Sequence, residues 1–151
     1  MLFRSRAVAF VANEDGISRL YLRDAAGRTP RAVPDIPPGV IDTIAFDAHG
    51  ERLAIGLNRA DAPSDVYVLR LAEGELQRWT QSEVGELDPA RFVRPELVRY
   101  PTFDTVDGAT RTIPAFYYRP QGAGPFPVVV MIHGGPEGQD RKSTRLNSSH
   151  T

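Results

Sequence analysis

The chain has 151 residues, of which 41% are hydrophobic and 25% are charged, and its formal net charge is -1. This near-neutral balance gives no reason to expect nucleic acid or an anionic membrane surface as a partner. Cysteine is absent, which excludes disulfides, thiolate metal sites and cysteine nucleophiles, and no apolar run approaches the roughly 20 residues that span a bilayer.

The first half of the chain is predicted to form short antiparallel strands joined by tight polar turns. Asp15-Gly16 lies between two apolar runs, which is a strong hairpin signal. A further four strands follow one another from residue 41 onward, a pattern typical of one β-propeller blade. The expected strands are 7–12, 18–23, 30–33, 41–46, 52–57, 65–71 and 76–80.

A partial internal repeat supports the propeller. Leu20-Tyr21-Leu22-Arg23 corresponds to Val66-Tyr67-Val68-Leu69 at an offset of 67 − 21 = 46 residues, and Ala9 to Ala54 at 54 − 9 = 45. Four-stranded blades repeat at about 40–45 residues. Residues 1–82 are therefore predicted to be a partial β-propeller of about one and a half blades, although any all-β meander would give similar alternation.

Residues 83–96 break this rhythm and are predicted to be a linker. They carry several charges and prolines without period-2 alternation. A short helical turn is expected at 88–91, because Asp88 is a plausible N-cap and Pro89 would occupy the favoured first helical position.

A hairpin is predicted next, with strands at 97–105 and 111–118 around the turn Asp107-Gly108. Tyr117 and Tyr118 are interpreted as packing residues rather than catalytic ones, because aromatic residues on strands are usually cross-strand partners.

Residues 128–132, Val-Val-Val-Met-Ile, are followed by His133-Gly134-Gly135-Pro136. Continuous hydrophobicity predicts a strand that is buried on both faces, as in a parallel sheet covered by helices. Two glycines after the strand allow backbone N–H groups to turn toward a common point. A glycine-rich loop of this kind supplies one donor of the oxyanion hole in α/β-hydrolases.

With its Pro/Gly-rich approach, PVVVMIHGGP resembles the start of the catalytic domain of prolyl oligopeptidase family serine peptidases, especially the acylaminoacyl-peptidase-like branch. The segment 92–98 and the Asp107-Gly108 turn resemble the same family's entry into that domain. The resemblance implies a mainly β fragment: the end of a β-propeller followed by the first strands of an α/β-hydrolase domain, here residues 97–139.

The resemblance also implies the chemistry. A serine would attack a peptide carbonyl with a histidine as base and an aspartate orienting it, while Gly134 and Gly135 would donate to the oxyanion. His133 is expected to shape that loop, because the triad histidine comes last in chain order. The triad Ser, Asp and His are not in this sequence, so the chain itself is predicted to be inactive. His49 is expected to be a surface residue.

Residues 140–151 are polar, and read back into codons they resemble the translation of a DNA-sequencing adapter. They are interpreted as a non-native tail, and Ser143, Ser148, Ser149 and His150 are given no function because none lies in a G-x-S-x-G elbow.

The leading hypothesis is thus a fragment of a serine peptidase that hydrolyses short peptides. An esterase or lipase, and a non-enzymatic propeller binding module, remain the alternatives. No cofactor or metal is implied, since no fingerprint for either is present. Peptide is the expected partner of the parent enzyme, a cytoplasmic location is the default, and the oligomeric state is left open. Alone, the fragment is expected to aggregate or to remain disordered, because its apolar strands lack neighbours.

Overall fold

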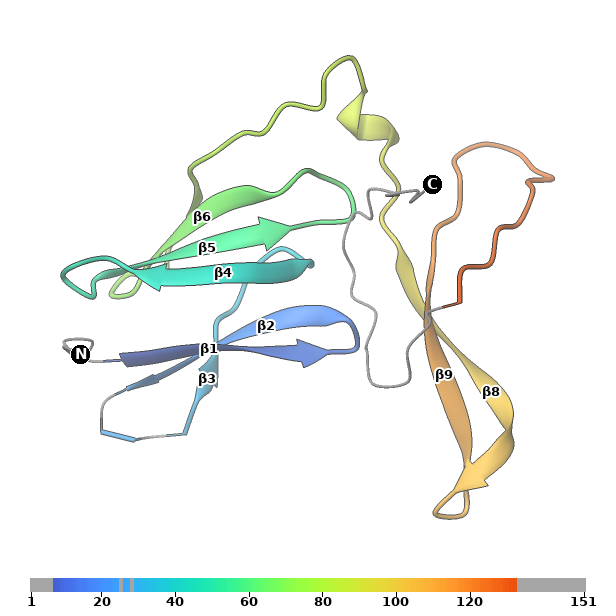
Figure 1. The fold of residues 1–151 in the computed structure, drawn as a ribbon, viewed down its shortest axis with the longest axis horizontal. Helices are drawn as coiled ribbons and strands as arrows, with labels where there is room; N and C mark the ends of the chain where they lie inside the picture. The colour runs from blue at the N-terminus through green and yellow to red at the C-terminus, as the bar shows by residue number, and fades with distance from the viewer. Residues whose placement is uncertain (1–6, 25, 28, 133–151) are drawn as a thin grey trace, which may run out of the picture.

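The computed structural model describes residues 7–24, 26–27 and 29–132. This part of the chain is mainly β, with one 3₁₀ turn, and its strands form three antiparallel sheets. Figure 1 shows two of the sheets facing each other and the third, a long hairpin, standing to one side. The mainly β fold expected from the sequence is confirmed.

The first sheet, sheet A, has the order β1-β2-β3. Its strands are β1 (Ala7–Glu14), β2 (Ile17–Asp24) and β3 (Arg31–Ala32). The predicted hairpin turn is present: Asp15 and Gly16 both have positive φ, 53° and 79°, as a two-residue type I′ turn requires.

The second sheet, sheet B, is a four-stranded meander with the order β4-β5-β6-β7. Its strands are β4 (Val40–Phe46), β5 (Arg52–Asn58), β6 (Asp65–Arg70) and β7 (Leu76–Arg78). A β-bulge between Ile41 and Thr43 inserts one extra residue into β4. The apolar side chains before and after the bulge therefore lie on the same face of the sheet. The four strands predicted from residue 41 onward are therefore confirmed, with boundaries shifted by one or two residues.

The main apolar core lies between sheets A and B. Alternate residues of β5 are fully buried, because side chains two apart on a strand share a face. Each such side chain stabilises the fold by about 1.5–3 kcal/mol relative to an exposed one. The buried members of the cluster are Leu20, Ile41, Leu53, Ile55, Leu57, Tyr67 and Leu69.

One backbone hydrogen bond is repeated in the two sheets. The Val33 N–H donates to the Leu20 carbonyl at 2.8 Å, and the Trp79 N–H donates to the Val66 carbonyl at 2.8 Å. Both partners are displaced by the same interval, 66 − 20 = 46 and 79 − 33 = 46. The offset found in the sequence is thus a structural repeat, in which β1, β2 and β3 correspond to β5, β6 and β7.

Beyond sheet B the chain crosses to the third sheet. The predicted helical turn is the 3₁₀ helix η1 (Pro89–Arg91), and the Asp88 side chain caps it by accepting from the Ala90 N–H at 3.0 Å. The predicted hairpin is β8 (Glu96–Val106) and β9 (Ala109–Tyr117), and Asp107 and Gly108 form its turn with positive φ.

Candidate functional site

The residues predicted to form the oxyanion loop, His133, Gly134 and Gly135, lie outside the described residues, as does the whole of 140–151. Their roles therefore stay predictions. The structure does describe the segment that leads to them and the contacts that join the long hairpin to sheets A and B.

The strand predicted at 128–132 is not formed in this chain. These residues have no regular secondary structure, and their side chains are 70–89% exposed. The prediction of a strand buried on both faces is wrong here, because strand order depends on hydrogen bonds to neighbouring strands and no described strand pairs with this segment. The local sequence has strand character, but none of the described strands pairs with it or covers it.

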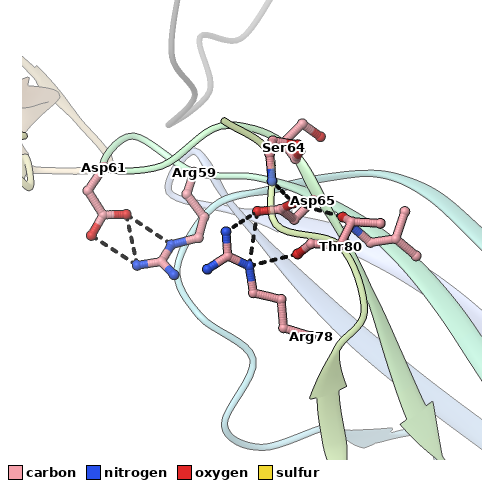
Figure 2. A network of polar contacts seen from close by, with 8 residues as sticks. Arg59, Asp61, Ser64, Asp65, Arg78 and Thr80 are labelled. Atoms are coloured by element: carbon pink, nitrogen blue, oxygen red, sulfur yellow. Dashed lines mark hydrogen bonds and ion pairs between the residues drawn. The ribbon is translucent and has the colours of Figure 1, made fainter. Parts of the chain in front are cut away.

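The linker is attached to sheet B through a carboxylate shared by two arginines. Asp61, in the loop between β5 and β6, receives two hydrogen bonds of 2.9 Å from the Arg59 guanidinium, as Figure 2 shows. Arg94 of the linker also donates to Asp61. Burial raises the pKa of Asp61, but the hydrogen bonds and positive charges of both arginines outweigh it and leave the pKa below its usual value.

A cavity of about 280 Å³ lies where this loop meets the linker. Prolines from the loop before β4 and from the linker form part of its wall, and the arginine pair forms another part. The lining residues are Pro37, Pro38, Arg59, Ala60, Asp61, Arg94 and Pro95.

A second ion pair joins the long hairpin to sheet A. Arg99 of β8 donates to Asp15, in the turn between β1 and β2. By the structural repeat, that turn corresponds to the β5–β6 loop that carries Asp61. The linker and the hairpin are therefore held at the same end of both sheets.

Among the described residues, the most buried carboxylate is that of Asp65, at the start of β6, and it ties this strand to β7 and the segment that follows. Its side chain is 2% exposed and accepts from Thr80 Oγ1 at 2.7 Å, from the Ser82 N–H at 2.9 Å and from Arg78 Nε at 3.0 Å. Burial raises the pKa of Asp65, but these bonds and the charge of Arg78 lower it by more, so the carboxylate is ionised well into acid.

Sequence reasoning missed this network (Figure 2). Its donors follow Asp65 by 13 to 17 residues, and no short motif signals pairing over that interval. The only usable signal was an acidic residue at the start of an otherwise apolar strand, a position where an unpaired charge is costly.

The remaining candidates behave as surface or packing residues. His49 is exposed in the turn between β4 and β5, as predicted. Tyr117 is paired across the hairpin with Glu96. Within the described ranges, no three His, Asp or Glu side chains converge as metal ligands. Helices of the length and hydropathy needed to cross a bilayer are likewise not found in that part of the chain.

No family model and no curated protein matches this chain. Among solved structures, 28 chains match. One is a prolyl endopeptidase from a study of two such enzymes and their inter-domain dynamics, with a TM-score of 0.59 and 16% sequence identity. The match covers 74% of this chain and 16% of that one. The chain thus has the mainly β fold of a small part of a prolyl endopeptidase.

Proposed function

We propose that this chain is a segment of a serine peptidase of the prolyl oligopeptidase type, spanning the junction between a β-propeller and an α/β-hydrolase domain. Residues 1–82 would be the propeller part, 83–96 the linker and 97–139 the beginning of the catalytic domain. The observation that carries the proposal is the order of its parts: a fold similar to part of a prolyl endopeptidase precedes the sequence His133-Gly134-Gly135-Pro136.

In this proposal the chain supplies one element of the catalytic machinery. The backbone N–H groups of Gly134 and Gly135 stabilise the oxyanion that forms when a serine attacks a peptide carbonyl. One such donor contributes about 2.7–4 kcal/mol to the transition state, or about a hundredfold to a thousandfold in turnover. The nucleophile, its base and the orienting aspartate would come from a longer polypeptide, so these 151 residues are inactive by themselves.

The exposed Val128–Ile132 segment supports the same proposal. Five adjacent apolar side chains in water are unfavourable by about 1.5–3 kcal/mol each relative to burial. A central strand of a hydrolase sheet would bury all of them. The hairpin β8–β9 likewise exposes Tyr100, Phe103 and Ile113, which is expected of a segment that packs against a domain outside this chain.

The test is to extend the coding sequence and to treat the complete protein with a fluorophosphonate probe that labels activated serines. We expect labelling of a serine within a downstream G-x-S-x-G, and hydrolysis of short peptides in preference to simple esters. The 151-residue chain is the matched control and should not be labelled. A complete protein that contains no such serine would support the propeller binding module instead, and a preference for esters would support the esterase.

A further inference from the structure

The long hairpin β8–β9 makes little contact with sheets A and B. Its two strands pack on each other, and among the described elements neither packs extensively on β1–β7. In Figure 1 the hairpin stands to one side of both sheets. Two ion pairs cross from this part of the chain to the sheets, Arg94–Asp61 from the linker and Arg99–Asp15 from β8. The position of the hairpin on the sheets therefore depends strongly on charged contacts.

The two aspartates occupy matching places in the structural repeat. Asp15 and Asp61 are 61 − 15 = 46 residues apart, and each lies in the loop between two corresponding strands, β1–β2 and β5–β6. The two sheets are fixed to each other by their shared apolar core and by Ser18. Its N–H donates to the Gly39 carbonyl and its Oγ accepts from the Ile41 N–H, both at 2.9 Å. The two carboxylates are therefore held at a fixed separation.

The two arginines lie on one short segment that can reach both carboxylates. They are 99 − 94 = 5 residues apart, and five extended residues span at most about 18 Å, whereas packed sheets lie about 10 Å apart. Pro95 restricts Arg94 before it to extended conformations. Pro95 is itself buried and lines one cavity with Pro37 and Pro38. The main chain between the two arginines is thus set in place when both pairs are formed.

We propose that the two ion pairs act as a single electrostatic latch, which holds the linker and the hairpin on sheets A and B and releases them together. Once one pair has formed, the other forms within the same molecule at a high effective concentration. The Arg94 and Arg99 side chains are 79% and 45% exposed. Each pair should therefore change the ratio of docked to released molecules by only about twofold to fivefold, so that salt or a single substitution loosens the latch.

The latch does not require the chain to begin or end where this sequence does. All four side chains lie within the described residues, so a longer polypeptide that contains this chain keeps both pairs. Neither pair involves a residue of the proposed oxyanion loop, and the latch is therefore independent of the peptidase assignment. It sets the orientation, relative to the two sheets, of the hairpin that precedes Val128–Ile132.

The experiment measures the distance distribution between two spin labels in the full 151-residue chain. Because the chain has no cysteine, Glu73→Cys beside sheet B and Thr110→Cys on the hairpin place the labels at exposed sites outside both pairs. Wild type should show one predominant, docked distance at low salt. A second, broader population should grow severalfold at about 1 M NaCl, where the screening length falls to about 3 Å.

Asp15→Asn and Arg94→Gln each remove one pair. Asparagine keeps the shape of the side chain and favours the positive φ of residue 15, so the β1–β2 turn stays intact. Each variant should raise the ratio of released to docked molecules about twofold to fivefold. The double variant should raise it by the product of the two factors and should lose most of the salt dependence.

A matched control lies on the same hairpin. Arg111→Gln breaks the ion pair between Arg111 and Asp104, within the hairpin itself, and should leave the label distances unchanged. Arg99→Lys keeps the charge and should remain mostly docked, because Arg99 donates to Asp15 through a single nitrogen. Circular dichroism verifies that each variant is folded.

A second measurement does not need the 151-residue chain to stay monomeric. In the complete protein, a glutamate-specific protease cleaves the linker after Glu86, a site that every variant retains. Cleavage should accelerate by the same factors, because its rate follows the released population. Label distances and cleavage rates that ignore Arg94→Gln, an equal response to Arg111→Gln, or a wild type that is insensitive to salt would overturn the proposal.

Discussion

The substitution Asp65→Asn tests the buried network of sheet B. The change preserves the shape of the side chain but removes its charge, and it leaves one oxygen in place of two. That oxygen can still accept from Thr80 and the Ser82 N–H. The new amide, however, would present N–H groups to Arg78, which donates through both Nε and Nη2 in the native chain.

The expected loss follows from the two charge-assisted bonds to Arg78. Hydrogen bonds to charged groups are worth about 1.5–3 kcal/mol each, and an unsatisfied buried group adds to the loss. Because Arg78 is 39% exposed, its guanidinium regains water, so part of this energy is recovered. We expect Asp65→Asn to lower the free energy of unfolding by about 3 kcal/mol, a large fraction of the stability of a small domain.

The assay is urea unfolding at low protein concentration, followed by the fluorescence of Trp79, which adjoins Arg78 in the chain. The matched control is Glu75→Gln, which breaks an ion pair with Arg70 at which both side chains are about half exposed. That change should cost less than about 1 kcal/mol. Equal effects of the two substitutions, or a loss below about 0.5 kcal/mol for Asp65→Asn, would refute the reasoning.

Three further outcomes are expected. The pKa of Asp65 is lower in the folded chain than the roughly 3.9 of an unfolded one. The stabilisation by its carboxylate is therefore complete above that pH and is lost as pH falls through the folded-state pKa. In an acid titration, Asp65→Asn should lose less free energy of unfolding than wild type does, and identical profiles would contradict this. Gly39→Ala should destabilise by about 1–3 kcal/mol, because its Cβ would lie 2.4 Å from the Asn58 carbonyl oxygen; thermal melting checks it, and a neutral result would contradict the close approach. Arg94→Ala removes a largely exposed guanidinium from Asp61, whose carboxylate keeps its two bonds to Arg59. It should change the free energy of unfolding by less than about 1 kcal/mol but speed limited proteolysis of the linker; unchanged cleavage would show that the pair does not hold the linker.

Local patterns were sufficient to predict most strands. Asp15-Gly16 and Asp107-Gly108 each formed the turn that their sequence favours, and Asp88 capped the short helix before which it stands. These features depend on neighbours within a few residues. The spacing of Tyr21 and Tyr67 likewise predicted a repeat that the hydrogen-bond pattern bears out.

Features that depend on distant residues were predicted poorly. The Asp65 network joins residues 13 to 17 apart, and the Arg99–Asp15 pair joins residues 84 apart, so no periodicity signals either. Val128–Ile132 has the composition of an interior strand, yet a strand exists only where others pair with it. The predicted loop His133-Gly134-Gly135 lies outside the described residues and stays a prediction.

Hydrogen exchange of the amides of residues 128–132 tests the central claim most directly, namely that this segment is an interior strand whose sheet is completed by a longer polypeptide. The measurement compares the 151-residue chain with the complete protein. We predict rapid exchange in the chain and strong protection in the complete protein, because buried strands exchange only on global unfolding. Equally rapid exchange in both would contradict the hydrolase assignment.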